Sequence, residues 1–92
     1  MSSSTYNIVS NQNVAVSSTT AVTSNAVGTP FVRLASTTAC YVVFGAAPTA
    51  TSSGVLINPS DVGEIFKIPA GFKVAAIRVT GDGVLSVTAV DL

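Results

Sequence analysis

Residue types that carry out enzyme chemistry are scarce in this chain of 92 residues. It has no histidine, one cysteine, four acidic residues and four basic residues. Without histidine the commonest general base is missing, and neither a Ser-His-Asp nor a Cys-His arrangement can form. The single cysteine, Cys40, lies among alanine, tyrosine, valine and phenylalanine. An apolar setting raises the pKa of a thiol, so we expect Cys40 to be a buried, inert side chain.

The acidic residues do not form a convincing metal site either. Asp61 and Glu64 are three residues apart, but calcium needs further oxygen ligands, and only Asn58 and backbone groups are near in sequence. A turn-capping aspartate and a solvent-facing strand glutamate are the simpler interpretation. Asp82 stands between two glycines, which is typical of a turn residue. We therefore expect no catalytic residue, no metal site and no cofactor.

Charge is low and unevenly distributed along the chain. The formal net charge is zero, and of the charged residues only Arg33 precedes residue 61. Four scattered cations cannot form the basic stripe that releases counterions from phosphates, so we expect no nucleic-acid partner. A surface with so few charges suits a protein that meets another protein over much of its area.

The sequence predicts neither secretion nor membrane insertion. Its first residues lack the basic and apolar regions of a signal peptide, and no run of about 18 apolar residues is present. We therefore expect synthesis in a cytoplasm and no membrane partner.

Composition and periodicity predict an all-β fold. Apolar types make up 48% of the chain and the mean hydropathy is +0.62, which excludes disorder caused by high charge and low hydrophobicity. Alternation of apolar and polar residues dominates, with β-branched residues in the alternating runs, and turn signals separate these runs. We expect a small antiparallel β-sandwich, or a compact barrel, with an extended N-terminal segment.

The predicted strands cover residues 31–35, 38–46, 55–57, 62–68, 72–80 and 84–90. Both faces of the 38–46 strand are apolar, which indicates a central strand or one buried against a partner. The last two strands are joined by Gly81-Asp82-Gly83, which predicts a β-hairpin, because glycine tolerates the positive φ of primed turns. We expect this hairpin and the 38–46 strand to form the core.

We expect two parts, an uncharged N-terminal segment of residues 1–30 and a sandwich core of residues 31–92. The segment is rich in serine and threonine, and its spaced valines fit extended structure. Two arrangements of this segment stay open. It supplies one or two edge strands of the same sandwich, or it is an arm that adds a strand to an exposed sheet edge of a neighbouring molecule.

Several pieces between Arg33 and Val90 follow one another in a characteristic order. Residues 33–45 have a strand-turn-strand pattern in which a single cysteine is followed by an aromatic residue and then by Phe-Gly. The further pieces are Pro48-Thr49-Ala50-Thr51, Phe66-Lys67-Ile68-Pro69-Ala70-Gly71, Lys73-Val74-Ala75-Ala76-Ile77 and Gly83-Val84-Leu85-Ser86-Val87-Thr88. In the order of these pieces the chain resembles a family of small tailed-bacteriophage virion proteins, which are similar to capsid decoration (cement) proteins. The resemblance implies a compact β-sandwich on the outer shell, as a dimer or trimer, without catalytic residues.

On this basis we expect a non-enzymatic virion protein, a decoration protein on the capsid surface whose partners are the major capsid protein and other copies of itself. The predicted contact residues are Tyr6, Ile8, Val14, Val16, Arg33, Pro48 and Thr49. Arg33 fits either an ordinary surface residue or an interface anchor that pairs with a carboxylate. Two alternatives stay open, namely a collar, tail or head-fibre-base protein of the same fold, and a host-glycan adhesion module. The sequence disfavours the adhesion module, because it has no tryptophan and few aromatic residues for stacking on sugars.

Overall fold

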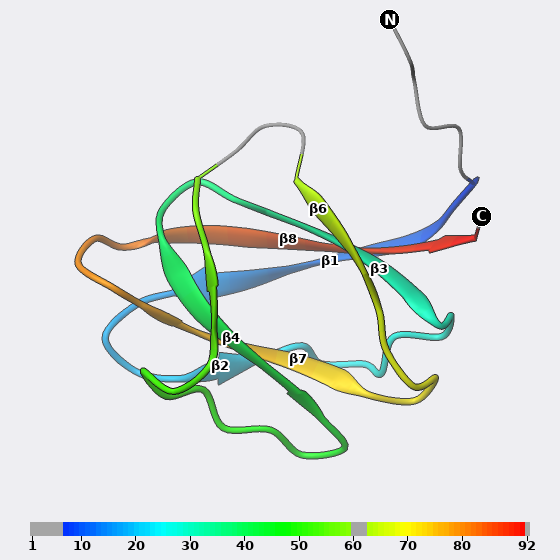
Figure 1. Ribbon diagram of the computed structural model, residues 1–92, viewed down its shortest axis with the longest axis horizontal. Coiled ribbons are helices and arrows are strands. Elements are labelled where there is room, and N and C mark those ends of the chain that lie inside the picture. Colours follow the sequence, from blue (N-terminus) through cyan, green and yellow to red (C-terminus); the bar gives the residue numbers. More distant parts are fainter. Residues whose placement is uncertain (1–6, 60–62, 92) are drawn as a thin grey trace, which may run out of the picture.

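Residues 7–59 and 63–91, which the computed structural model describes, form two four-stranded sheets that pack face to face (Figure 1). The strands are β1 (Asn7–Val16), β2 (Ala21–Val22), β3 (Phe31–Ser36), β4 (Cys40–Gly45), β5 (Val55–Ile57), β6 (Glu64–Lys67), β7 (Lys73–Arg78) and β8 (Gly83–Asp91). Sheet A has the order β1-β8-β3-β6 and sheet B the order β2-β7-β4-β5, with antiparallel neighbours throughout. The predicted all-β sandwich is confirmed.

The hydrophobic core lies between the two sheets and follows from the alternation along the strands. Side chains two residues apart point to the same face of a strand. In β3 these are Val32 and Leu34, and in β4 they are Cys40 and Val42, all of them 0% exposed. The core residues are Val14, Val16, Val27, Val32, Leu34, Cys40, Val42, Ile57, Ile68, Val74, Ala76, Leu85, Val87 and Ala89. The spacing of valine that predicted strands is therefore also the spacing that fills this core.

The predicted strand positions agree with the structure within a few residues. The strand predicted over 62–68 is shorter, since β6 covers Glu64–Lys67. Val62, the first residue of that predicted strand, lies outside the described residues. Of the two positions left open for the 38–46 strand, the structure has the central one, since β4 lies between β7 and β5 in sheet B.

The predicted hairpin of the last two strands is wrong. β7 pairs with β2 and β4 in sheet B, whereas β8 pairs with β1 and β3 in sheet A, so the Gly81-Asp82-Gly83 turn carries the chain from one sheet to the other. Neither glycine of the turn has a positive φ; among the described residues this conformation occurs at Gly63 and Gly71. The turn chemistry indicated a reversal of the chain, but it could not indicate which strands would pair.

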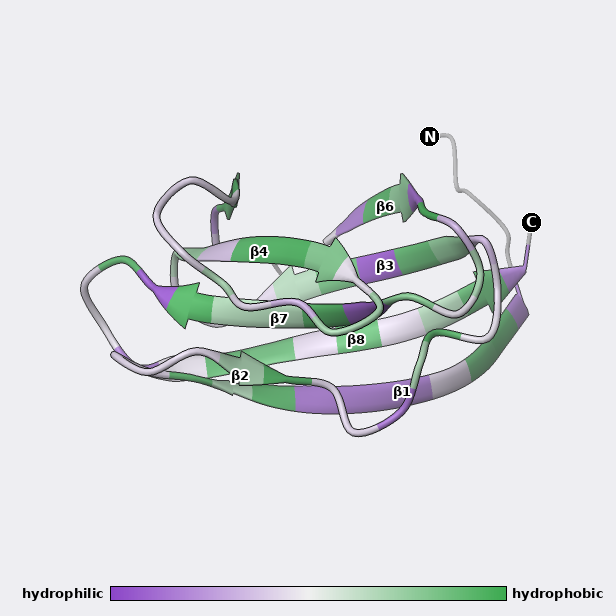
Figure 2. Ribbon diagram, turned by 90° about the horizontal axis from the view of Figure 1, so that it is seen from below, coloured by the Kyte–Doolittle hydropathy of each residue, from purple (hydrophilic) through white to green (hydrophobic). Residues whose placement is uncertain are grey.

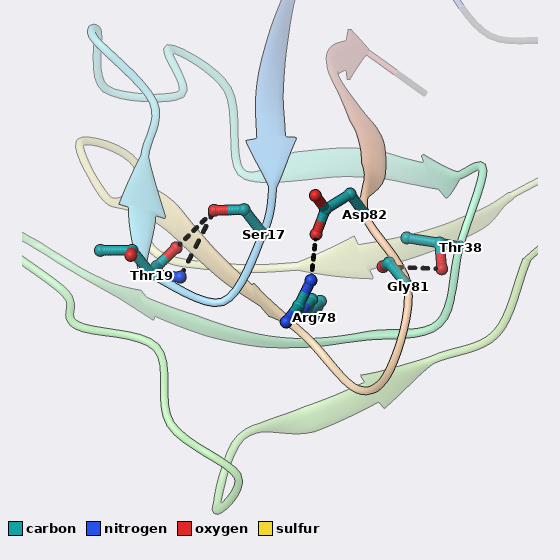
Figure 3. A network of polar contacts seen from close by, with 6 residues as sticks. All are labelled: Ser17, Thr19, Thr38, Arg78, Gly81 and Asp82. Atoms are coloured by element: carbon teal, nitrogen blue, oxygen red, sulfur yellow. Dashed lines mark hydrogen bonds and ion pairs between the residues drawn. The ribbon is translucent and has the colours of Figure 1, made fainter.

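The β7–β8 turn is held against the β3–β4 turn by hydrogen bonds. Thr38 Oγ1 donates to the Gly81 carbonyl at 3.0 Å (Figure 3). The Val84 amide donates to Thr37 Oγ1 at 2.9 Å, and the Thr37 amide donates to the Val84 carbonyl at 3.0 Å. A Cβ added to Gly83 would lie 2.6 Å from Thr38 Cγ2. Position 83 therefore requires glycine because the two turns approach each other closely.

Gly83→Ala is expected to lower the free energy of unfolding by about 2 kcal/mol, because the two turns must separate to admit the methyl group. Gly81→Ala is the matched control, since its Cβ would meet Thr38 Oγ1 at 3.4 Å, an ordinary contact. Urea denaturation of both variants measures the difference. Equal stabilities of the two variants would contradict the close approach described for Gly83.

Residues 7–22 supply one edge strand to each sheet, which is the first of the two arrangements left open by the sequence. β1 pairs with β8 along its whole length, and β2 pairs with β7. The side chain of Gln12 in β1 also binds the backbone of the segment that follows β2. Its Nε2 donates to the Asn25 carbonyl, and the Asn25 amide donates to Gln12 Oε1, both at 3.0 Å. The described part of the N-terminal segment is thus built into the sandwich.

Candidate contact surfaces

The one thiol of the chain is buried in the core, as predicted. Cys40 is 0% exposed, and its Sγ lies 3.7 Å from Ser36 Oγ. Burial raises the pKa of the Cys40 thiol, and the hydrogen bond with Ser36 opposes this shift. A raised pKa means that less thiolate is present at neutral pH than for an exposed cysteine, so both access and ionisation disfavour reaction.

Labelling of Cys40 with a thiol-reactive disulfide reagent is expected to be at least about 100-fold slower in the native protein than in urea-unfolded protein, because the reagent must wait for an opening of the fold. Absorbance of the released thiolate, followed at pH 8 with and without denaturant, measures the ratio. Equal rates in the two conditions would contradict the buried position.

Arg78 and Asp82 form an exposed ion pair. Arg78 Nη1 lies 2.6 Å from Asp82 Oδ1 across the β7–β8 turn (Figure 3), and the two side chains are 36% and 67% exposed. Such a pair contributes about 0–1 kcal/mol, so it secures the turn only weakly. Glu64 is exposed at the start of β6, and Asp61 lies outside the described residues.

Residues 7–59 and 63–91 lack two further features. No group of three or more metal-ligating side chains of the His, Cys, Asp or Glu type gathers there. None of the described segments is a helix with the length and apolar character needed to cross a membrane.

The outer face of sheet B is apolar. Residues directly opposite each other in an antiparallel pair point to the same face, so Leu56, Tyr41 and Ile77 form one row across β5, β4 and β7. Val79 continues this face, since its amide donates to the Ala39 carbonyl at 3.1 Å. Leu56 is 48% exposed and Val79 39% exposed. We call Tyr41, Leu56, Ile77 and Val79 the apolar patch.

Charged residues are absent from most of sheet B. The strands β2, β4 and β5 contain none, and β7 has Lys73 at its first position and Arg78 at its last. Arg78 is engaged with Asp82. The strands that carry the apolar patch therefore have charges only at the two ends of β7.

The β4–β5 connection covers another part of the outer face. The Ala50 amide donates to Thr20 Oγ1 at 2.8 Å, and Thr20 directly precedes β2 on the far side of β7. The connection therefore runs over β7, as Figure 2 shows. This explains why Ala75, which points outward beside Val43, is 0% exposed. The apolar patch lies in a part of the face that this connection leaves open.

The outer face of sheet A is more polar. Asn11 of β1 lies opposite Thr88 of β8, and Thr88 lies opposite Arg33 of β3. Asn11 Oδ1 accepts hydrogen bonds from Ser86 Oγ and Thr88 Oγ1, both at 2.8 Å. Amides and hydroxyls therefore satisfy one another along β1 and β8, and Ile65 of β6 lies opposite Arg33 at the other side of this row.

The contact residues predicted from sequence fall on separate parts of the molecule. Ile8 is 68% exposed in the first part of β1, and Arg33 is half-buried on the outer face of sheet A. Pro48, half-buried, and Thr49, exposed, lie in the connection that covers sheet B. Tyr6 lies outside the described residues. The structure does not gather these side chains into one surface.

Two of the predicted contact residues must be corrected. Val14 and Val16 are 2% and 1% exposed and belong to the core, because they face the interior from β1 while their neighbours face solvent. They cannot contact a partner while the fold is intact. Sequence reasoning in turn missed the apolar patch, although the finding that both faces of the 38–46 strand are apolar already indicated it at Tyr41.

Comparison of the chain with protein-family models, with curated proteins and with solved structures found no match.

Proposed function

We propose that this chain is a non-enzymatic structural protein of a bacteriophage virion, a decoration protein that binds the outer capsid shell by protein–protein contacts. The apolar patch of sheet B is the observation that carries this proposal. The major capsid protein is the partner, and the capsid surface is the site of action. The resemblance of residues 33–90 to decoration proteins supplies the virion setting.

The apolar patch supports a contact function because its residues are contiguous. Single exposed apolar side chains are normal on a protein surface, whereas a contiguous group indicates an interaction site. Leu56, Tyr41 and Ile77 are held in one row by three paired strands. A partner would therefore meet a surface whose shape is already fixed, and less conformational entropy would be lost on binding.

The low charge of sheet B supports the same proposal. Burying an unpaired charge in an interface is costly, so interface centres are depleted of charged residues. A standard interface buries about 800 Å² on each partner. The accessible surface of the chain is 5011 Å², so such an interface would use about one sixth of it. In such an interface the apolar patch would form the centre, and the surrounding residues of sheet B would form the rim.

The copy number of the chain in purified virions tests the proposal. Quantitative mass spectrometry of particles of the phage that encodes the chain, referenced to the major capsid protein, gives this number. A decoration protein is expected in a fixed, high ratio to the major capsid protein. A few copies per particle would indicate a collar, tail or fibre-base position instead, and absence from the particles would contradict the proposal.

A glycan array tests the adhesion module. The proposed shell contact predicts no bound glycan, because the apolar patch contains a single aromatic side chain, Tyr41, which is half-buried. Specific binding of one glycan class that Tyr41→Ala abolishes would contradict the proposal.

A further inference from the structure

We propose that β1 pairs with β1 of a second copy of this chain, in antiparallel orientation about a two-fold axis. This joins the two A sheets into one sheet of eight strands. The inference does not rest on the proposed function, because it concerns another edge of the molecule and is measured on the purified chain.

The observation that starts the argument is the free edge of β1. This strand of ten residues pairs with β8 on one side and is the last strand of sheet A on the other. An edge strand presents unpaired backbone N–H and C=O groups, which are a template for another strand. At about 3.3 Å per residue, β1 offers an edge of about 33 Å.

Stable monomers protect such edges in ways that β1 mostly lacks. The usual means are lysine or other charges, proline, a very short strand, a β-bulge, or a loop that covers the edge. The segment that contains Asn25 reaches β1 through hydrogen bonds to the side chain of Gln12, which lies on the same face of the strand as Val14 and Val16. β1 contains no charged residue and no proline. Its register shift lies between Ile8 and Ser10, near its first residue. From Ser10↔Ala89 to Val16↔Gly83 the pairing is regular, so the greater part of the strand contains no bulge.

The absence of charge favours a second copy over other partners. A two-fold axis brings each residue near the axis close to the same residue of the other copy, so a charge there would face its own kind. The chain carries no charge before Arg33. Two copies that meet along β1 therefore encounter no like-charge repulsion from this strand, and a charged partner would find nothing to pair with.

The side chains of β1 fix the register. Asn11 and Asn13 point to the outer face of sheet A, and both are exposed. An axis through Gln12 places Asn11 of each copy opposite Asn13 of the other. Each amide has donors and an acceptor, so the pair is self-complementary. Asn11 Oδ1 is already used by Ser86 and Thr88, which leaves its Nδ2 for the second copy or for Asn13 of its own chain, 3.4 Å away.

The test is the mass of the purified full chain by size-exclusion chromatography with light scattering, at two concentrations. The parent is expected to run at twice the chain mass of 9.2 kDa. Asn13→Lys is expected to run at the mass of one chain, because the two new charges would face the partner across the axis. Asn58→Lys, the same change at an exposed position after β5, is expected to leave the mass at two chains.

Hydrogen exchange of the β1 amides separates loss of pairing from loss of folding. In Asn13→Lys the β1 amides that face away from β8 should exchange at least about tenfold faster than in the parent, while β3 and β7 keep their protection. A parent that is monomeric at both concentrations would overturn the inference. A trimer would also overturn it, and so would a dimer that Asn13→Lys does not dissociate.

Discussion

Leu56→Lys is expected to lower the amount of chain bound to capsid shells by at least about tenfold, without unfolding the sandwich. Leu56 is 48% exposed at the middle of β5, and the other residues of the apolar patch lie on one side of it. A lysine there would bring an unpaired ammonium group into the proposed interface. Since about 1.4 kcal/mol corresponds to a factor of ten in affinity, even a partly solvated charge suffices.

Val84→Lys is the matched control for this prediction. Val84 is 44% exposed, nearly as much as Leu56, but it lies in β8 of sheet A. Both variants should unfold within about 0.5 kcal/mol of the parent, because both changes are on the surface. Sedimentation of shells with labelled chain measures binding. If Leu56→Lys bound as well as the parent, or if both variants lost binding equally, the apolar patch would not be part of the proposed contact.

Leu34→Ala is expected to lower the free energy of unfolding by about 3 kcal/mol, which is a large share of the stability of a domain of this size. Leu34 is 0% exposed at the centre of β3, between Val87 of β8 and Glu64 of β6. Removing its branched end loses buried apolar area and leaves a cavity between two sheets whose backbones are fixed by hydrogen bonds.

Ile65→Ala is the control for the core prediction. Ile65 belongs to β6, which pairs with β3, but it is 38% exposed. We expect a loss below about 1 kcal/mol from this change. Urea denaturation followed by circular dichroism measures both variants. If Leu34→Ala cost no more than Ile65→Ala, the inward position of Leu34 would be contradicted.

Strand positions could be predicted from the sequence because the signal is local. Alternation of apolar with polar residues marks a strand with one buried face, and this holds for β8, where Leu85, Val87 and Ala89 alternate with Ser86 and Thr88. Strand pairing is not local. The Gly81-Asp82-Gly83 turn has the composition of a hairpin, yet the chain changes sheets there. The partners of β8 are β1 and β3, which lie far away in sequence.

The contact surfaces were harder to predict, because exposure depends on pairing. Val14 and Val16 lie in an uncharged segment, which suggested that they contact a partner. The pairing of β1 with β8 instead orients their side chains into the core. The sequence around Leu56 and around Ile77 does not indicate that either residue belongs to a contact surface. They become neighbours only when β5, β4 and β7 align in sheet B.

The measurement that tests the central claim most directly is a cryo-electron microscopy reconstruction of shells mixed with the purified chain. The proposal predicts density for one sandwich at each of a set of equivalent sites on the outer surface. It also predicts that sheet B, with Leu56 and Val79 of the apolar patch, faces the major capsid protein. Shells without added density, or a bound sandwich whose sheet B faces solvent, would contradict this account.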